Sequence, residues 1–264
     1  MESREFLGTH SVFTLPEAVA ALTPGNRKGA LDRLQYFARR GLVKQVAHGV
    51  YASVPPGVDA ATFIADRYLV AASLRADAVF SHHAALELLG AAHSDWNECS
   101  VLTHRRRPPV NVAGVTLRFV PYPTMLVRRH QEALGVRTVD RLGRRLRVTG
   151  PERTLVDGFW QPNLVGGLVE LIESAAGFGV LDLDLLREIL EAYGRKTLWA
   201  AVGWFLERHQ RTFFVSPDYL GQMQRHRPIS PHYLDTPRGQ GRLATRWNLV
   251  MPEALAAGAE PDEP

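Results

Sequence analysis

The hydrophobic pattern at the start of the chain predicts two short helices. Thr14 and Glu17 have the spacing of a capping box, and the apolar residues behind them predict a helix from about 15 to 22. Asn26 can cap a second helix, in which apolar residues recur at helical spacing until Gly41. The two predicted helices are therefore separated only by a short turn.

A hairpin is predicted immediately after these helices. Residues 42–46 and 50–52 have β-like patterns, and they are joined at His48-Gly49. Glycine suits this place because tight hairpin turns use a positive φ. Helix, turn, helix and hairpin in this order are typical of a winged helix-turn-helix.

A linker is expected next, because Pro55-Pro56-Gly57 ends any preceding strand pairing and stiffens the chain. We therefore expect two domains, 1–55 and 56–264. The second domain contains helical patterns near 60–75 and 82–89 and β-like patterns at 99–102, 115–120 and 146–149. After Pro151 the pattern becomes helical, with one more strand expected at 247–250.

These patterns predict an α+β protein. An N-terminal winged helix-turn-helix is followed by a larger, mixed α/β C-terminal domain that ends in a helical region. The apolar runs are too short to cross a membrane, and the N-terminus does not resemble a secretory signal, so a cytoplasmic protein is expected. The single cysteine, Cys99, excludes an internal disulfide.

Charge is distributed unevenly along the chain. The net charge is only +4, but residues 101–150 hold 11 basic and 2 acidic side chains. A local excess of basic charge can attract a polyanion even where the total is small. Arg105, Arg106 and Arg107 lie in this block and form a possible secondary basic patch, for which a solvated loop is the alternative interpretation.

The second predicted helix carries the candidate DNA contacts. If Leu31, Leu34 and Ala38 face the core, the opposite face presents polar and cationic side chains to solvent. The start of a recognition helix is the part that reaches base edges, and surrounding cations contact phosphates. Solvated charges on a domain used for protein association are the alternative. The predicted DNA-binding residues are Asn26, Arg27, Lys28, Arg33, Gln35, Arg39, Arg40, Lys44 and, at the wing tip, His48.

Three stretches resemble the AbiEi family of antitoxins. The first is LQYFARRGLVKQVAHGVYAS, residues 34–53, which is similar to the end of that family's winged-helix domain. The second, TGPERTLVDGFWQPNLVGGLVELIE at 149–173, resembles its E-R-T-L-x-D phrase followed by Pro and Gly-Gly. The third, RWNLVMP at 246–252, resembles its closing strand.

This resemblance implies a transcriptional regulator from a two-gene phage-defence system. Such a protein represses its own operon, so its expected partners are operator DNA and the nucleotidyltransferase toxin encoded beside it. No membrane partner, cofactor or metal is expected. A nucleic-acid-processing enzyme targeted by a winged helix, or a winged module used only for protein assembly, are the alternatives.

Catalytic residues are not expected. Asp182 and Asp184 have the spacing of magnesium-binding carboxylates, but residues 150–181 lack the Gly-Ser turn that would hold phosphates, and helix N-capping by one of these two aspartates is the better explanation. Glu152 suits the first turn after Pro151, and Arg153 can pair with Asp157 four residues later. Glu152, Arg153 and Asp157 are therefore predicted to form a structural clasp.

Overall fold

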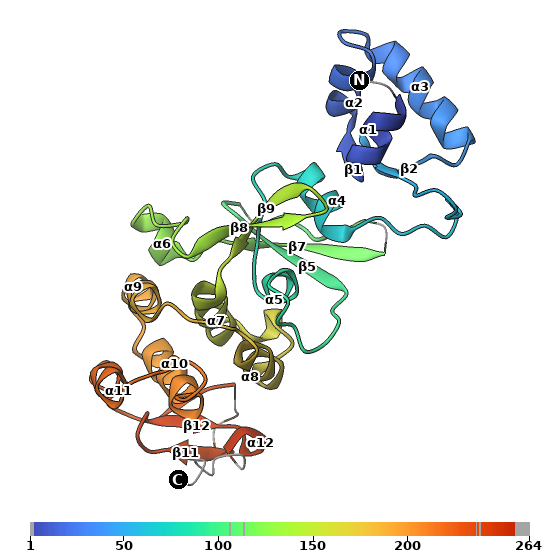
Figure 1. Ribbon diagram of the computed structural model, residues 1–264. Coiled ribbons are helices and arrows are strands. Elements are labelled where there is room, and N and C mark those ends of the chain that lie inside the picture. The colour runs from blue at the N-terminus through green and yellow to red at the C-terminus, as the bar shows by residue number, and fades with distance from the viewer. Residues whose placement is uncertain (1–2, 106, 113, 236, 238, 257–264) are drawn as a thin grey trace. The chain divides into compact units, whose positions relative to one another are not determined.

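The protein belongs to the α+β class, as the sequence predicts. The computed structural model describes residues 3–105, 107–112, 114–235, 237 and 239–256, which form helices and three β-sheets (Figure 1). The chain divides into two compact units. The first comprises Met1–Val79, Asn97–Val120 and Thr138–Arg147, and the second comprises Phe80–Trp96, Pro121–Arg137 and Val148–Pro264.

The first unit begins with three helices and three short strands. The elements are α1 (Ser3–Thr9), β1 (Val12–Thr14), α2 (Leu15–Leu22), α3 (Arg27–Arg39), β2 (Val43–Ala47) and β3 (Val50–Ser53). The strands form an antiparallel sheet in the order β1-β3-β2. The sequence did not predict α1 or β1. Three residues are too few to show a period, and Val12 and Phe13 become a strand by pairing with Ala52 and Tyr51.

Local capping signals explain where α2 begins. The Thr14 amide donates to Glu17 Oε2 at 2.6 Å, and the Glu17 amide donates to Thr14 Oγ1 at 3.4 Å. These two bonds satisfy amides that the first helical turn leaves without partners. The capping box predicted from the sequence is therefore present.

The buried face of α3 differs from the predicted one. Ala30, Leu34 and Phe37 are buried, whereas Ala38 is exposed and Leu31 is only partly buried. Phe37 takes the place in the core that we expected for Ala38, because its larger ring packs with Phe6, Phe13 and the other apolar side chains of this part of the chain.

A six-stranded sheet lies in the middle of the chain, in the order β6-β7-β5-β4-β9-β8. The three strands predicted in this region are present as β5, β7 and β9, but their partners β4, β6 and β8 were not predicted. The elements are α4 (Arg67–Leu74), β4 (Val79–Phe80), α5 (His83–Leu88), β5 (Glu98–Thr103), β6 (Val110–Val112), β7 (Val115–Pro121), α6 (Thr124–Arg128), β8 (Val136–Arg141) and β9 (Arg144–Thr149).

The second unit contains the longest run of helices. They pack around one apolar core, to which α7, α8, α9 and α10 all contribute. The elements are α7 (Pro151–Trp160), a 3-10 helix (Pro162–Leu164), α8 (Leu168–Ala176), α9 (Leu183–Tyr193), α10 (Lys196–Arg208), α11 (Pro217–Gln224), β10 (His232–Tyr233), β11 (Arg242–Ala244), β12 (Leu249–Met251) and α12 (Glu253–Ala256).

The predicted helical end of the chain is interrupted by a small sheet. Only the strand near 247–250 was predicted, yet β12 pairs with β10 in parallel and with β11 in antiparallel orientation. Next to this sheet, the fully buried indole of Trp247 occupies the space that Gly203 leaves on α10, where an added Cβ would lie 2.2 Å from the ring. Its Nε1 donates to Glu207 Oε2 at 2.6 Å, so the polar atom of the ring is satisfied.

Candidate functional site

The start of α3 combines a helix N-terminus with exposed cations. Asn26 caps the helix, because its Oδ1 accepts a hydrogen bond from the Gly29 amide at 2.8 Å. Arg27 and Lys28 follow in the first turn, both exposed, and that turn holds no acidic residue. The positive end of the helix dipole and two cations therefore act at the same place, which favours an anionic ligand.

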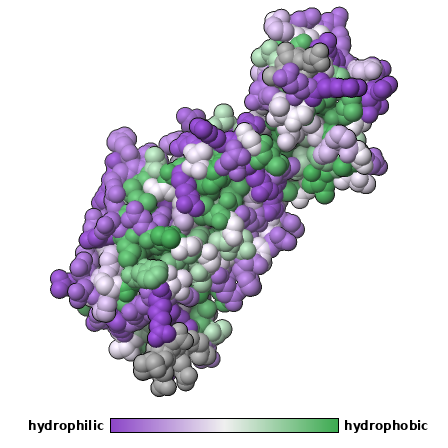
Figure 2. All heavy atoms as spheres, viewed as in Figure 1, coloured by the Kyte–Doolittle hydropathy of each residue, from purple (hydrophilic) through white to green (hydrophobic). Residues whose placement is uncertain are grey.

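The solvent-facing side of α3 continues this cationic surface. Gln35 and Arg39 are exposed on the side opposite the buried residues, and hydrophilic side chains cover most of the helix in the view of Figure 2. Arg40 ends the helix, with its guanidinium carbon 5.8 Å from the centre of the exposed Tyr36 ring. Lys28, Gln35 and Arg39 thus share one accessible side of α3.

Two predicted phosphate contacts have partners inside the chain. Arg33 Nη1 donates to the Leu22 carbonyl at 3.1 Å. The Lys44 ammonium donates to the carbonyls of Ala61 and Phe63, at 3.3 and 2.8 Å. Lys44 therefore ties the segment after the prolines to β2 and has one N–H left for another acceptor.

The β2–β3 turn faces α3 across a groove. Gly49 has the positive φ, +70°, that the turn requires, and its carbonyl accepts from the Leu15 amide at 2.8 Å. The exposed His48 lies at this turn. A groove of about 720 Å³ is lined by Arg27 and Gln35 from α3 and by His48 from the turn. Leu31 and Ala38 also line it, which accounts for their incomplete burial.

A buried polar cluster is centred on α7, in the second unit. Arg153 and Asp157 are almost completely inaccessible, and Arg153 Nε donates to Asp157 Oδ2 at 3.0 Å. The Tyr193 hydroxyl donates to the other carboxylate oxygen, and Arg153 Nη1 donates to the Leu134 carbonyl at 2.8 Å. Burial alone would lower the pKa of Arg153, but Asp157 and Tyr193 raise it. The guanidinium is therefore held charged inside the fold.

Glu152 connects α7 to the start of α9. Its Oε1 accepts from the Asp182 amide at 2.8 Å. Asp182 in turn caps α9, since its Oδ1 accepts from the amides of Asp184 and Leu185, both at 3.0 Å. The sequence predicted that one of Asp182 and Asp184 caps a helix, and the structure identifies Asp182 as the cap. Within the described ranges, His, Cys, Asp and Glu side chains do not gather in groups of three or more that could hold a metal ion.

His82 lies beside this cluster with a strained backbone. It precedes α5 at φ +54°, a value that non-glycine residues rarely adopt, and its ring is buried. Its Nδ1 is 2.9 Å from Ser81 Oγ and its Nε2 is 3.2 Å from Gln161 Oε1. Burial lowers the pKa of His82, although the negative charge of Asp157 opposes this shift. The ring is therefore held in its neutral form.

This burial predicts an acid-sensitive fold. The folded-state pKa of His82 lies below that of the unfolded chain, so the unfolded state takes up a proton first as pH falls below about 6.5. The free energy of unfolding should then fall by up to about 1.4 kcal/mol per pH unit from this side chain. In denaturant unfolding between pH 7 and pH 5, the free energy of unfolding of the His82→Asn variant should fall less steeply than that of the parent.

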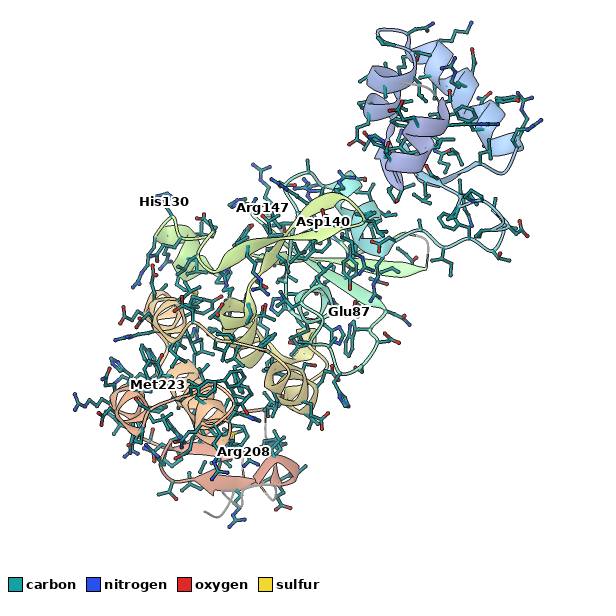
Figure 3. All side chains as sticks on the ribbon, in the orientation of Figure 1. Glu87, His130, Asp140, Arg147, Arg208 and Met223 are labelled. Atoms are coloured by element: carbon teal, nitrogen blue, oxygen red, sulfur yellow. The ribbon has the colours of Figure 1, made fainter. Side chains whose placement is uncertain are left out.

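The control for this experiment is His130→Asn. His130 also has a positive φ, +55°, but it is exposed, in the turn that follows α6 (Figure 3). The same substitution in a similar backbone conformation should leave the parent's pH dependence intact. If the free energy of unfolding depends on pH equally in the His82→Asn variant and the parent, His82 is not the source of the acid sensitivity.

A second buried histidine was not singled out as a site residue from the sequence. His83 Nδ1 is 3.2 Å from Glu87 Oε1, and His83 Nε2 is 3.4 Å from Glu170 Oε1 (Glu87 is labelled in Figure 3). Burial would raise the pKa of Glu170, but hydrogen bonds from Ser94 and Ser174 lower it. The contact with Glu87 lies within α5, between residues four apart, whereas the contact with Glu170 joins α5 to α8, far along the sequence, where no local pattern indicates it.

The secondary basic patch lies in the β5–β6 loop. Arg105 and Arg107 are exposed there, and the Arg105 carbonyl accepts from Thr103 Oγ1 at 2.9 Å. Arg106 lies outside the described residues. None of the helices in the described part of the chain has the length and apolarity that a bilayer span requires.

Comparison with known proteins identifies a shared fold. No protein-family model matches the chain, and no curated protein matches it. A solved structure, that of the Rv2827c protein from Mycobacterium tuberculosis, is similar with a TM-score of 0.57 and 20% sequence identity. The similarity covers 91% of this chain and 86% of that one, so the likeness extends over most of both folds.

Proposed function

We propose that residues 3–53 form a winged helix-turn-helix that binds DNA. The observation that carries this proposal is the element order α1-β1-α2-α3-β2-β3, with its sheet order β1-β3-β2 and with cations exposed on α3. In such a domain the second helix of the helix-turn-helix enters the major groove and the hairpin contacts the neighbouring backbone. Here these roles fall to α3 and to the β2–β3 turn.

The candidate contacts divide into two kinds. Arg27 and Lys28, in the first turn of α3, are assigned to base edges, as is Asn26 through its Nδ2 because its oxygen caps the helix. Arg39 and Arg40, at the other end of the helix, are assigned to phosphates, which contribute affinity without sequence information. His48 at the turn extends the surface across the groove.

We further propose that the protein represses its own operon and acts as the antitoxin of a cognate nucleotidyltransferase toxin, in the cytoplasm and without enzymatic activity. The support is the resemblance of three stretches to AbiEi antitoxins. The stretch at 149–173 contains the buried pair Arg153–Asp157, and the one at 246–252 contains Trp247. Both lie in the second unit, away from α3 in the chain, where DNA binding alone does not require them.

Two substitutions on α3 should affect DNA binding in different ways: one should reduce sequence preference and the other should reduce affinity for all sequences. The Lys28→Ala variant should lose about 1–3 kcal/mol of discrimination between promoter and unrelated DNA, because it loses a base contact. The Arg39→Ala variant should weaken promoter and unrelated DNA alike and reduce the slope of log affinity against log salt by about 1. Binding of both duplexes by fluorescence anisotropy at several salt concentrations measures both effects.

Arg4→Ala is the matched control, since Arg4 is an exposed cation on α1 outside the proposed contact surface. It should leave promoter affinity unchanged. If both α3 variants bind like the parent, α3 does not read DNA. If the purified protein with magnesium degrades or modifies nucleic acid, and Asp182→Ala abolishes this activity, the enzyme alternative replaces our proposal.

A further inference from the structure

The basic block at 101–150 does not act as a single charged surface. Several of its arginines are occupied by acceptors within the chain, as their hydrogen bonds show. The occupied residues are Arg118 with Glu98, Arg129 with the Glu191 carbonyl, Arg141 with Asp66, and Arg144 with Ser73. Strand β9 carries two that are not: in the part of the chain that the structure describes, neither Arg145 nor Arg147 has a hydrogen bond or an ion pair.

The pleat of β9 places these two guanidinium groups on the same side. Arg145 and Arg147 are exposed, whereas Leu146 and Val148 between and beyond them are buried. Alternate residues of a strand point to the same face and are roughly 6.7 Å apart. The backbone therefore fixes the spacing of the two residues, and both side chains leave the strand on the same face (Arg147 is labelled in Figure 3).

Protection of a sheet edge does not explain this pair. Exposed charges often keep an edge strand from pairing with another chain. In the sheet order β6-β7-β5-β4-β9-β8, however, β9 lies between two partners and β8 forms the edge. The arginines of β9 are thus on a strand that has a hydrogen-bonded partner strand on each side.

The hairpin formed by β8 and β9 is joined to the proposed DNA-binding region through α4. Arg141 Nε donates to Asp66 Oδ2 at 2.9 Å, and Arg144 Nη1 donates to Ser73 Oγ at 2.6 Å, at the two ends of α4. Helix α4 also packs against β1 and β3, and all of these segments belong to the first compact unit. Arg145 and Arg147 on β9 and the helix α3 are therefore parts of one unit.

We infer that Arg145 and Arg147 form a second phosphate-binding site, which holds duplex DNA beside the operator core. The inference rests on the proposed DNA-binding function. A polyanion with regularly repeated charges suits two cations fixed on a strand, and arginine binds phosphate through paired N–H donors. The acidic residue of the same hairpin, Asp140, has one carboxylate oxygen bonded to the Gly143 amide at 3.1 Å. The site contributes affinity and footprint length but no sequence preference.

The test compares two promoter duplexes with the full-length protein. One is the shortest duplex that the protein binds sequence-specifically, and the other adds flanking DNA of scrambled sequence. For the parent, the flanks should strengthen binding about tenfold or more and make it more salt-dependent. In the variant Arg145→Gln/Arg147→Gln this gain should disappear, and the salt slope on the long duplex should fall by about 2. Affinity for the short duplex should stay the same.

The variant Arg128→Gln/Arg225→Gln is the matched control, because it removes two exposed arginines of the second unit. It should keep the gain from the flanks. If the β9 variant keeps the gain and the salt slope of the parent, the second site is overturned. Lys28→Ala on the short duplex tests α3 separately, so failure of one site is distinguishable from failure of the other. Loss of toxin capture by the β9 variant with unchanged DNA binding would assign the pair to an acidic protein instead.

Discussion

Replacement of Asp157 by alanine is expected to destabilise the protein by about 3–5 kcal/mol, because it leaves a buried guanidinium without its carboxylate. Arg153 has no exposed surface, and its Nε bond to Asp157 is 3.0 Å long. The same carboxylate accepts from the Tyr193 hydroxyl, so the substitution also removes a buried hydrogen bond that joins α7 to α9. Denaturant unfolding measures the loss.

Two further variants separate an unpaired charge from a simple loss of volume. Asp184→Ala breaks an ion pair with Arg187 on α9 that is largely exposed, and it should change stability little. The double variant Arg153→Met/Asp157→Leu removes both charges, so it should lose less stability than Asp157→Ala alone. If the double variant is as unstable as the single one, the charge is not the cause. If Asp157→Ala is as stable as the parent, the cluster does not hold the second unit together.

Loss of promoter binding without loss of toxin rescue is the second large effect that we expect. The variant Lys28→Ala/Arg39→Ala should lose about 100-fold or more in promoter affinity, because it removes one of the base contacts and one of the phosphate contacts that we propose for α3. It should still rescue cells that express the toxin, because the AbiEi-like stretches that contain Arg153 and Trp247 lie in the second unit and are unchanged.

The genes for this protein and for the toxin must both be expressed from unrelated promoters, so that loss of repression does not alter the level of either protein. Growth after induction of the toxin is then the readout, with soluble protein measured in parallel and Arg4→Ala as the control variant. A soluble double variant that binds no promoter and gives no rescue would show that antitoxicity depends on DNA binding.

Much of the fold could be predicted where short-range signals act. The capping box at Thr14, the cap at Asn26 and a cap formed by one of Asp182 and Asp184 occur as predicted, because a cap is formed by residues two or three positions apart. The hairpin turn at Gly49 was predictable for the same reason. The spacing of Arg153 and Asp157 likewise places the two side chains on one face of a helix.

Other features could not be predicted because they depend on partners far along the chain. Strand β1 exists through its pairing with β3, and packing with Phe6 and Phe13 decides that Phe37 rather than the neighbouring Ala38 enters the core. Sequence reasoning missed Tyr193 and His82 as members of the α7 cluster, since 36 residues separate Tyr193 from Asp157 and no periodicity connects them. Such contacts appear only once the chain has folded.

The sequence by itself determined the α+β class, most helices and the candidate cations. It did not determine which cations are available to a ligand, because that depends on whether folding brings an acceptor to each one. The Lys44 ammonium donates to two backbone carbonyls, and Arg144 on β9 donates to Ser73. Arg145, the next residue of β9, lies on the opposite face of that strand, away from Ser73. A guanidinium or ammonium group is identical in either case, and only tertiary structure decides whether its hydrogen bonds are already made.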